Sequence, residues 1–349
     1  MPALIEGRAA ASAPEGVPPA PDLGSAPAPP PVTRRRAARA ERPAFVADDA
    51  AFLAQLPLHA AIALLVPERY WEGACVAIER VASLRPNPRD DAVVRAMRRL
   101  GPAGPGDALA SRAVRREHTL QVLRERIAGW APALELAGAE HLERARSAGA
   151  GAVLWVAHFG FNALAGKMAI ARAGFEVEHV SRPEHGFSKS RFGIRALNPI
   201  RTGAERRYLA RRIVFDRADP AASMHEARRA LRENRFVSIT AGAWEGQRLA
   251  RVDVGGAGWP LSIGAPRLAA VAGAPLIPVF VVRDPATRRL RVEAEAPIPL
   301  ARGARPDAIA RAAQAFADAH LPYLRRWPRQ WREWEKLSSP APATPEPGC

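Results

Sequence analysis

The sequence predicts an α/β fold, with a mostly parallel central sheet that is flanked by helices and preceded by a helical N-terminal section. Two observations lead to this prediction. From about residue 149 to residue 337, short apolar runs alternate with segments of helical period, as expected of parallel strands joined by helices. Between residues 44 and 148, apolar side chains recur at helical spacing instead. We expect the two sections to form one domain.

In the α/β section, recognisable signals mark the ends of the expected elements. Gly174 ends one helix, and Asp219 with Pro220 makes a good N-cap and first residue for the next. The expected strands are 152–157, 175–180, 236–240, 276–282 and 290–296, the last two paired across a turn at 284–287. The expected helices are 161–173, 219–234, 265–272 and 305–324.

The rest of the chain reads as helices without recognisable chemistry, or as tails. Helices are expected from about residue 45, over 70–84 and 92–100, and again over 109–130 after a break at 102–106. Residues 1–43 are rich in Ala and Pro and end in an arginine cluster. Such a segment buries too little apolar surface to offset the entropy of ordering it. We therefore predict disordered tails at 1–43 and 338–349.

The charge balance favours an anionic partner. The 349 residues carry 51 Lys and Arg against 35 Asp and Glu, a formal net charge of +16. An arginine- and alanine-rich composition also follows from a GC-rich genome, so the charge is weak evidence by itself. It is compatible with a phospholipid surface, an acidic carrier protein or a nucleic acid. No base-readout motif supports a nucleic-acid partner, and none is expected.

The cysteine content and the hydropathy of the sequence indicate where in the cell the protein is located. Cys75 and Cys349 make neither a disulfide framework nor a zinc site, which predicts a reducing compartment, the cytoplasm. No apolar run approaches the ~20 residues of a membrane span, and the best one, at 60–66, is far too short. The N-terminus lacks the apolar core of a signal peptide. Membrane contact is therefore expected to be peripheral.

A histidine follows the most apolar strand candidate. The run 153–157 leads into His158, and a helix-like segment follows at once. Open α/β sheets bind ligands at the carboxyl ends of their strands, so His158 is a candidate general base. Asn162 lies one helical turn later on the same face. Its side-chain carbonyl is suited to accept the Nδ1–H and fix the tautomer. A hydrogen-bonded structural histidine is the alternative.

The loop after the second strand lies on the same rim. It holds Arg182 and Arg191, which are suited to bind a phosphate or an oxyanion. The histidines of the region, at 158, 179 and 185, are too irregularly spaced to argue for a metal site. No metal and no cofactor are expected. A solvated basic loop is the alternative for this segment.

Two further segments have weaker signals. The glycine-rich stretch 255–258 lacks dinucleotide-binding spacing, and Glu245 and Asp253 before it are the nearest acidic candidates for the site. The segment 325–334 interleaves arginine with tryptophan. That pattern suits a lipid headgroup interface, stacking on nucleic acid, or a terminal segment whose tryptophans pack on the core.

Taken in order, these segments resemble the lysophospholipid acyltransferase superfamily, specifically the branch of lipid A (Kdo-dependent, lauroyl/myristoyl) acyltransferases. The resemblance covers roughly residues 50 to 337. Four blocks carry it: Val-Ala-His-Phe-Gly at 156–160, Ser-Arg-Pro at 181–183 with Arg191, the glycine, short apolar helix and Pro-x-Phe strand of 264–283, and Trp-Pro-Arg-Gln-Trp with a further Trp at 327–334.

The resemblance implies acyl transfer at the cytoplasmic face of the membrane. His158 would take a proton from a hydroxyl of a lysolipid or glycolipid, and the oxygen would attack an acyl thioester on acyl carrier protein or coenzyme A. Arg182 or Arg191 would hold a phosphate or the oxyanion. The family places an acid five residues after its histidine, where this chain has Ala163. Three explanations account for this departure. Asn162 takes the place of the acid, or another carboxylate does. Alternatively, the chain is a catalytically weak or inactive relative that binds lipid or acyl carrier.

Overall fold

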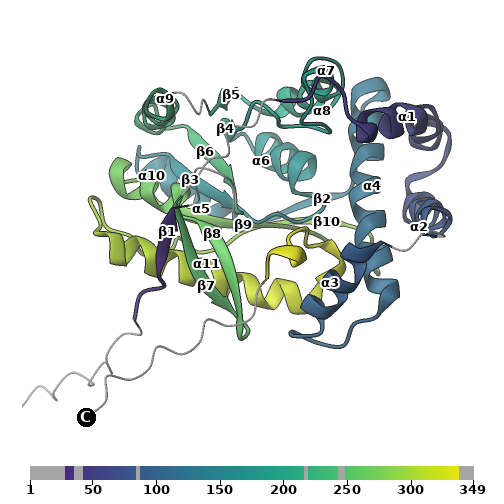
Figure 1. The fold of residues 1–349 in the computed structure, drawn as a ribbon. Helices are drawn as coiled ribbons and strands as arrows, with labels where there is room; N and C mark the ends of the chain where they lie inside the picture. The colour runs from purple at the N-terminus through teal and green to yellow at the C-terminus, as the bar shows by residue number, and fades with distance from the viewer. Residues whose placement is uncertain (1–27, 35–41, 84–86, 216–218, 243–247, 338–349) are drawn as a thin grey trace, which may run out of the picture.

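The computed structural model describes residues 28–34, 42–83, 87–215, 219–242 and 248–337. Their centre is a seven-stranded sheet with the order β2-β10-β9-β3-β6-β4-β5 (Figure 1). Neighbouring strands run parallel except β9 and β10. The strands are β2 (Leu134–Ala137), β3 (Ala152–Val156), β4 (Val177–Ser181), β5 (Arg211–Val214), β6 (Phe236–Thr240), β9 (Leu276–Arg283) and β10 (Leu290–Ala294). The predicted fold class is confirmed.

Two hydrophobic cores cover the two faces of the sheet. Along β3, Val153 and Trp155 belong to one core and Leu154 and Val156 to the other, because successive side chains of a strand point to opposite faces. The first core is completed by α9 (Pro220–Arg232), α10 (Gly264–Ala272) and α11 (Pro306–Arg326). The second is completed by α1 (Ala47–Leu65), α2 (Trp71–Ala82), α4 (Pro105–Ala128), α5 (Ala139–Ser147) and α6 (Lys167–Arg172).

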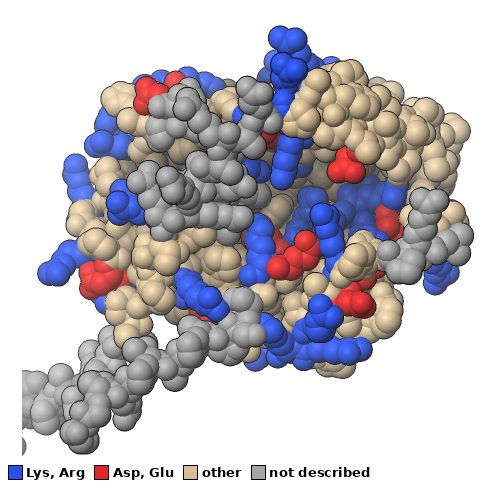
Figure 2. All heavy atoms as spheres, viewed as in Figure 1, with Lys and Arg blue, Asp and Glu red and all other residues tan. Residues whose placement is uncertain are grey.

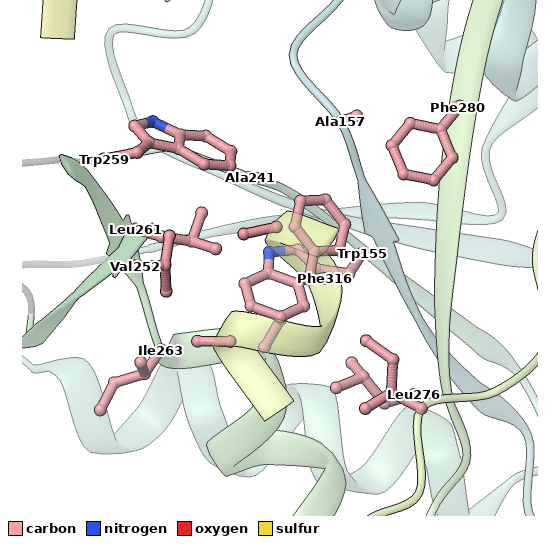
Figure 3. Packing of buried hydrophobic residues seen from close by; sticks show 14 of the residues in the cluster. Trp155, Ala157, Ala241, Val252, Trp259, Leu261, Ile263, Leu276, Phe280 and Phe316 are labelled. Carbon is pink, nitrogen blue, oxygen red and sulfur yellow. The ribbon is translucent and has the colours of Figure 1, made fainter. Parts of the chain in front are cut away.

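Aromatic side chains pack against one another within the first core (Figure 3). Trp155 stacks on Phe316 with ring centroids 4.2 Å apart, and Trp259 meets Trp331 edge-on at 5.4 Å. Each such pair adds about 0.5–1.5 kcal/mol to the free energy gained by burial. Trp331 and its neighbour Trp334 are fully buried. The tryptophan-rich C-terminal segment is therefore docked into the core, the third of the interpretations that its sequence allowed.

The section up to residue 148 is not wholly helical, so that prediction is wrong in part. Its helices α1, α2, α4 and α3 (Pro88–Met97) are present as expected. However, β2 follows them and pairs with β10 at the edge of the sheet, and α5 leads from it into β3. Four residues are too few for a strand's alternation of apolar and polar side chains to be recognised. The strand β5 is equally short. The helices α7 (Arg191–Ala196) and α8 (Asn198–Glu205) are too short to show a helical period, so all three were missed.

The predicted N-terminal tail contains one ordered strand. Strand β1 (Val32–Arg34) pairs antiparallel with β7 (Arg248–Val254), which forms a hairpin with β8 (Ala257–Ser262). The glycine-rich stretch is the turn of this hairpin, where Gly255 and Gly256 have φ of +59° and +83°. The prediction that all of 1–43 is disordered is therefore wrong at 32–34. Residues 1–27, 35–41 and 338–349 lie outside the described residues.

Helix α1 extends well beyond the apolar run 60–66 that was the best span candidate in the sequence. By length and composition it is the one helix of the described residues that could cross a bilayer, and 22% of its most apolar window is buried. Asp48, Gln55 and Pro57 interrupt its apolar residues, so no unbroken apolar run signals it. Leu58 and Leu65 are 49% and 81% exposed. One such helix is weak evidence for a membrane span.

Candidate active site

The C-terminal segment is paired with the chain just after β3. Phe159 forms an antiparallel bridge with Trp331, the backbone N–H of Gly160 donates to the carbonyl of Gln330 at 2.7 Å, and that of Arg332 donates to the carbonyl of His158 at 3.1 Å. This pairing brings residues 330–333 to the carboxyl end of the central strand β3. It joins segments that lie about half the chain apart in the sequence.

Gly160 is required for this close approach. A Cβ atom at this position would lie 2.1 Å from Cγ1 of Val114 in α4, a distance that packed atoms do not tolerate. Any larger residue would push the bridge away from α4. The glycine after the candidate histidine therefore serves the packing between β3, α4 and the C-terminal segment.

The pairing places a carboxylate on the candidate base. Nδ1 of His158 lies 2.9 Å from Oε1 of Glu333. The His158 side chain is 20% exposed, whereas that of Glu333 is 1% exposed. Lys336 donates to the same Oε1 at 2.6 Å, and Nε1 of Trp259 lies 3.4 Å from Oε2. These contacts fix the carboxylate, and the carboxylate in turn fixes the orientation of the imidazole.

The electrostatics favour a neutral histidine beside an ionised acid. Burial lowers the pKa of His158 to about 4, against the opposing effect of its bond to Glu333, with Arg332 and Lys336 lowering it further. Burial alone would raise the pKa of Glu333, but the hydrogen bond and charge of His158 and the charge of Lys336 bring it below its usual value. An ionised Glu333 only accepts, so Nδ1 carries the proton and the basic lone pair is on Nε2.

His158 lines a cavity of about 710 Å³, a volume typical of ligand pockets. The cavity lies at the carboxyl ends of β3, β4 and β6, where Val156, Ser181 and Thr240 contribute to its wall. This is the ligand-binding edge of an open α/β sheet. Part of the wall is apolar, with these side chains among others: Ile170, Val177, Phe187, Met224 and Leu268. In space-filling view, Lys and Arg side chains gather in and around the hollow near the centre of the molecule (Figure 2).

A second buried carboxylate stands behind the polar wall. Glu205 binds Lys167 at 2.6 Å, Arg201 at 2.7 Å and Nε2 of His185 at 2.8 Å. Although burial opposes ionisation, these three partners hold the pKa of Glu205 well below its usual range. Burial also lowers the pKa of His185 to about 4. Lys167, Arg201 and His185 all line the cavity, so two cations and a neutral histidine of this wall share one carboxylate.

Two predicted site residues lie at the cavity beside His158. Asn162 and Arg182 both contribute to its wall. Asn162 begins a π-helical turn, Asn162–Gly166, that precedes α6, and it is 6% exposed. The role expected of Asn162, to accept the Nδ1–H of His158, is filled by Glu333. Asn162 is thus a wall residue of the site.

Two other predicted residues, Arg191 and Asp253, are not brought to the cavity. Arg191 is the exposed first residue of α7, and its backbone N–H donates to the carbonyl of Pro43. Asp253 is exposed near the tip of the β7–β8 hairpin, where its Oδ1 accepts from the N–H of Gly256 at 3.1 Å. Neither is among the described residues that line the cavity. Glu245 lies outside the described residues.

Glu333 is the residue that the sequence analysis missed. It lies 175 positions from His158, within the tryptophan-rich segment whose packing the sequence left open. The one signal available in the sequence was an acid inside the tryptophan-rich segment 325–334. In the part of the chain that the structure describes, no group of three or more His, Cys, Asp or Glu side chains could hold a metal ion.

Comparison with known proteins does not indicate a function, so a function can be proposed only from the geometry of the site. No protein-family model matches the chain, and no curated protein matches it.

Proposed function

We propose that this protein is an acyltransferase that moves a fatty acyl group from a thioester donor to a hydroxyl of a lysolipid or glycolipid. The observation that carries the proposal is the His158–Glu333 pair, with Nδ1 and Oε1 2.9 Å apart, at the wall of a partly apolar cavity. A histidine held by a buried carboxylate is the arrangement that activates a hydroxyl nucleophile. It supplies by another route the acid that is absent at Ala163.

The reaction needs one base and one carbonyl carbon. Nε2 of His158 takes the proton of the acceptor hydroxyl as its oxygen attacks the thioester carbonyl. Glu333 stabilises the imidazolium that forms. The tetrahedral oxyanion then collapses, the C–S bond breaks, and the imidazolium returns its proton to the leaving thiolate. An ester and a free thiol result. Arg182 and the other cations of the wall stabilise the negative charge of the intermediate.

The apolar part of the cavity suits the acyl chain. Ile170, Phe187, Met224 and Leu268 line it, and these side chains offer no hydrogen-bonding groups to a bound chain. Burying a chain gains about 0.8 kcal/mol for each methylene group removed from water. The polar wall on the other side suits the reacting groups. The donor on this proposal is acyl coenzyme A or an acyl carrier protein.

The exposed side of α1 suits the membrane from which a lipid acceptor would come. Leu53, Leu58, Leu64 and Leu65 of this helix are all exposed. Pro43 and Val46, which precede this helix, line the cavity, so a lipid surface on α1 would lie near the cavity. We propose peripheral association with the cytoplasmic face, with the net positive charge of the chain favouring anionic lipid.

A non-catalytic protein that binds a lipid or an acyl carrier is the second candidate. The observation that favours it is the low basicity of His158, whose pKa is lowered to about 4. A general base works best with a pKa near the working pH. Both candidate functions predict that the protein binds lipid or acyl carrier, but only the acyltransferase predicts transfer of the acyl group.

Product analysis decides between them. The full chain is incubated with lauroyl coenzyme A and lysophospholipid vesicles, and lauroylated lipid is measured by mass spectrometry beside free thiol. Transfer by the wild type that is lost in His158→Ala supports the acyltransferase. The same assay is repeated with lauroyl acyl carrier protein as donor and with a glycolipid as acceptor. Lipid binding without acyl transfer in any of these assays supports the non-catalytic candidate. Equal transfer by wild type and His158→Ala contradicts the proposed mechanism.

A further inference from the structure

The cavity wall carries more positive than negative charge. Among the described residues that line it, six are Lys or Arg and two are carboxylates. Of the two, Glu184 is already paired with Arg42. Glu205 and Glu333 stand behind the wall and add two further negative charges. Of the six cations, Arg89 and Lys189 are exposed, whereas the other four are buried or half-buried, and burial makes unpaired charge costly. A bound anion would compensate the excess of positive charge.

Arg332 is the cation for which this imbalance is clearest. No carboxylate of the described residues lies within ion-pair distance of its guanidinium, although the side chain lines the cavity. Burial and the charges of Arg201 and Arg115 lower its pKa to about 9, against the opposing charge of Glu333. Arg201 lines the same cavity, and like charges that share a partly buried cavity repel each other.

The position of Arg332 relates it to the reacting atoms. Its backbone N–H donates to the carbonyl of His158 at 3.1 Å, and the next residue is Glu333. An anion held by Arg332 would lie beside the histidine–glutamate pair. Lys167 and Arg201, which line the same cavity, bring two further positive charges, and Glu205 offsets one of them.

We propose that Arg332, Lys167 and Arg201 form a binding site for the phosphate group of a phosphorylated lipid or thioester substrate. The local charge decides for phosphate. Three cations and Glu205 sum to +2, which matches the −1.5 to −2 that a phosphate monoester carries near pH 7. A carboxylate would leave a positive charge uncompensated. The planar guanidinium of Arg332 also fits two phosphate oxygens at once.

This inference deepens the proposed function and rests on it for the reaction, but binding of the phosphate does not require turnover. Two substrates can bring the group. It is the headgroup of a phosphorylated acceptor, or it is part of the donor, as in coenzyme A or a phosphopantetheine arm. The chemistry recognised at Arg332 is the same in both cases.

Calorimetric titration of the full chain with decyl phosphate tests the site. 1-Decanol has the same chain without the charge. The expected result is that Arg332→Gln binds decyl phosphate about 10- to 100-fold more weakly than the wild type, with binding of 1-decanol unchanged. Arg325→Gln, at an exposed position near the end of α11, is the matched control and should change neither. Equal affinity of the wild type for both ligands, or no loss in Arg332→Gln, overturns the proposal.

The stability of the unliganded variant separates binding from folding. Because Arg332 faces like charges in the empty cavity, Arg332→Gln should melt at the same temperature as the wild type or higher. A lower melting temperature without ligand would show that the residue is structural and would contradict the inference. His158→Ala should bind decyl phosphate as the wild type does, so loss of turnover and loss of the phosphate site are distinguishable.

Competition identifies the source of the phosphate. If the donor brings it, free coenzyme A displaces decyl phosphate and binds Arg332→Gln more weakly. If the acceptor brings it, lysophosphatidate displaces decyl phosphate and coenzyme A does not. Displacement by neither compound overturns the assignment of the site to a substrate.

Discussion

Two histidine–glutamate pairs border the same cavity, and they differ in what the carboxylate also holds. His158 lies 2.9 Å from Glu333, and His185 lies 2.8 Å from Glu205. Both carboxylates are almost fully buried, and the pKa of each histidine is lowered to about 4. By distance, burial and pKa the pairs are nearly equal.

The remaining partners separate them. Glu205 is shared by His185, Lys167 and Arg201, so its charge neutralises two permanent cations before it can stabilise an imidazolium. Glu333 has one further cation, Lys336, which is 29% exposed and therefore screened by water. Glu333 is the carboxylate better able to stabilise a positive charge that forms during a reaction. A close histidine–carboxylate pair alone does not identify a catalytic site.

The largest expected effect distinguishes the two histidines. His158→Ala removes the group that takes the proton and should abolish acyl transfer to the limit of detection. His185→Ala removes one donor of Glu205 and leaves the cations in place, so the rate should stay within about tenfold of the wild type. Initial rates with lauroyl coenzyme A measure both. Equal losses in the two variants would contradict the distinction between the pairs.

The two glutamates should fail in different ways. Glu333→Gln keeps the shape of the side chain but cannot stabilise the imidazolium, and should lower the rate about 10²- to 10⁴-fold. Glu205→Gln leaves Lys167 and Arg201 buried without a counter-charge, which should cost about 3–5 kcal/mol of unfolding free energy. Rates and urea denaturation of both variants provide the test. A Glu333→Gln variant that loses stability but not rate would assign Glu333 a structural role.

The pH dependence of the rate sharpens the role of Glu333. His158 must be neutral to act as a base, and burial lowers its pKa to about 4. Activity should therefore be retained as the pH falls from 7 to about 5 and decline through about 4. Glu333 raises the pKa of His158, so Glu333→Gln should move this decline to lower pH. A profile centred near 6.5 would mean that His158 is not buried beside this acid during the reaction.

A last expected effect concerns stability and does not depend on catalysis. The pKa of His158, of His185 and of His59 is lowered to about 4, in each case by burial first. Their unfolded pKa is near 6.5, so the unfolded chain binds more protons between these values. The stability they contribute is fully present above about pH 6.5 and is lost as the pH falls toward 4. Melting temperatures at pH 7.5 and pH 5 check this, and a higher value at pH 5 would contradict it.

The sequence predicts what local pattern determines. The apolar runs of β3 and β9 stand out because both strands are buried on both faces, and the position of His158 at the carboxyl end of β3 follows from them. Glu333 could not be predicted, because its place depends on a backbone bridge between Phe159 and Trp331. The prediction that Arg191 lies at the site was wrong, because its position in a sequence motif does not fix the direction of a side chain on a short helix.

The central claim is that Glu333, and not Asn162, is the partner of His158. Acyl-transfer rates of Glu333→Gln and Asn162→Ala, measured side by side at pH 7.5, test it most directly. The account predicts a loss of about 10²-fold or more for Glu333→Gln and less than about tenfold for Asn162→Ala, which lines the cavity. A larger loss in Asn162→Ala than in Glu333→Gln would contradict the account.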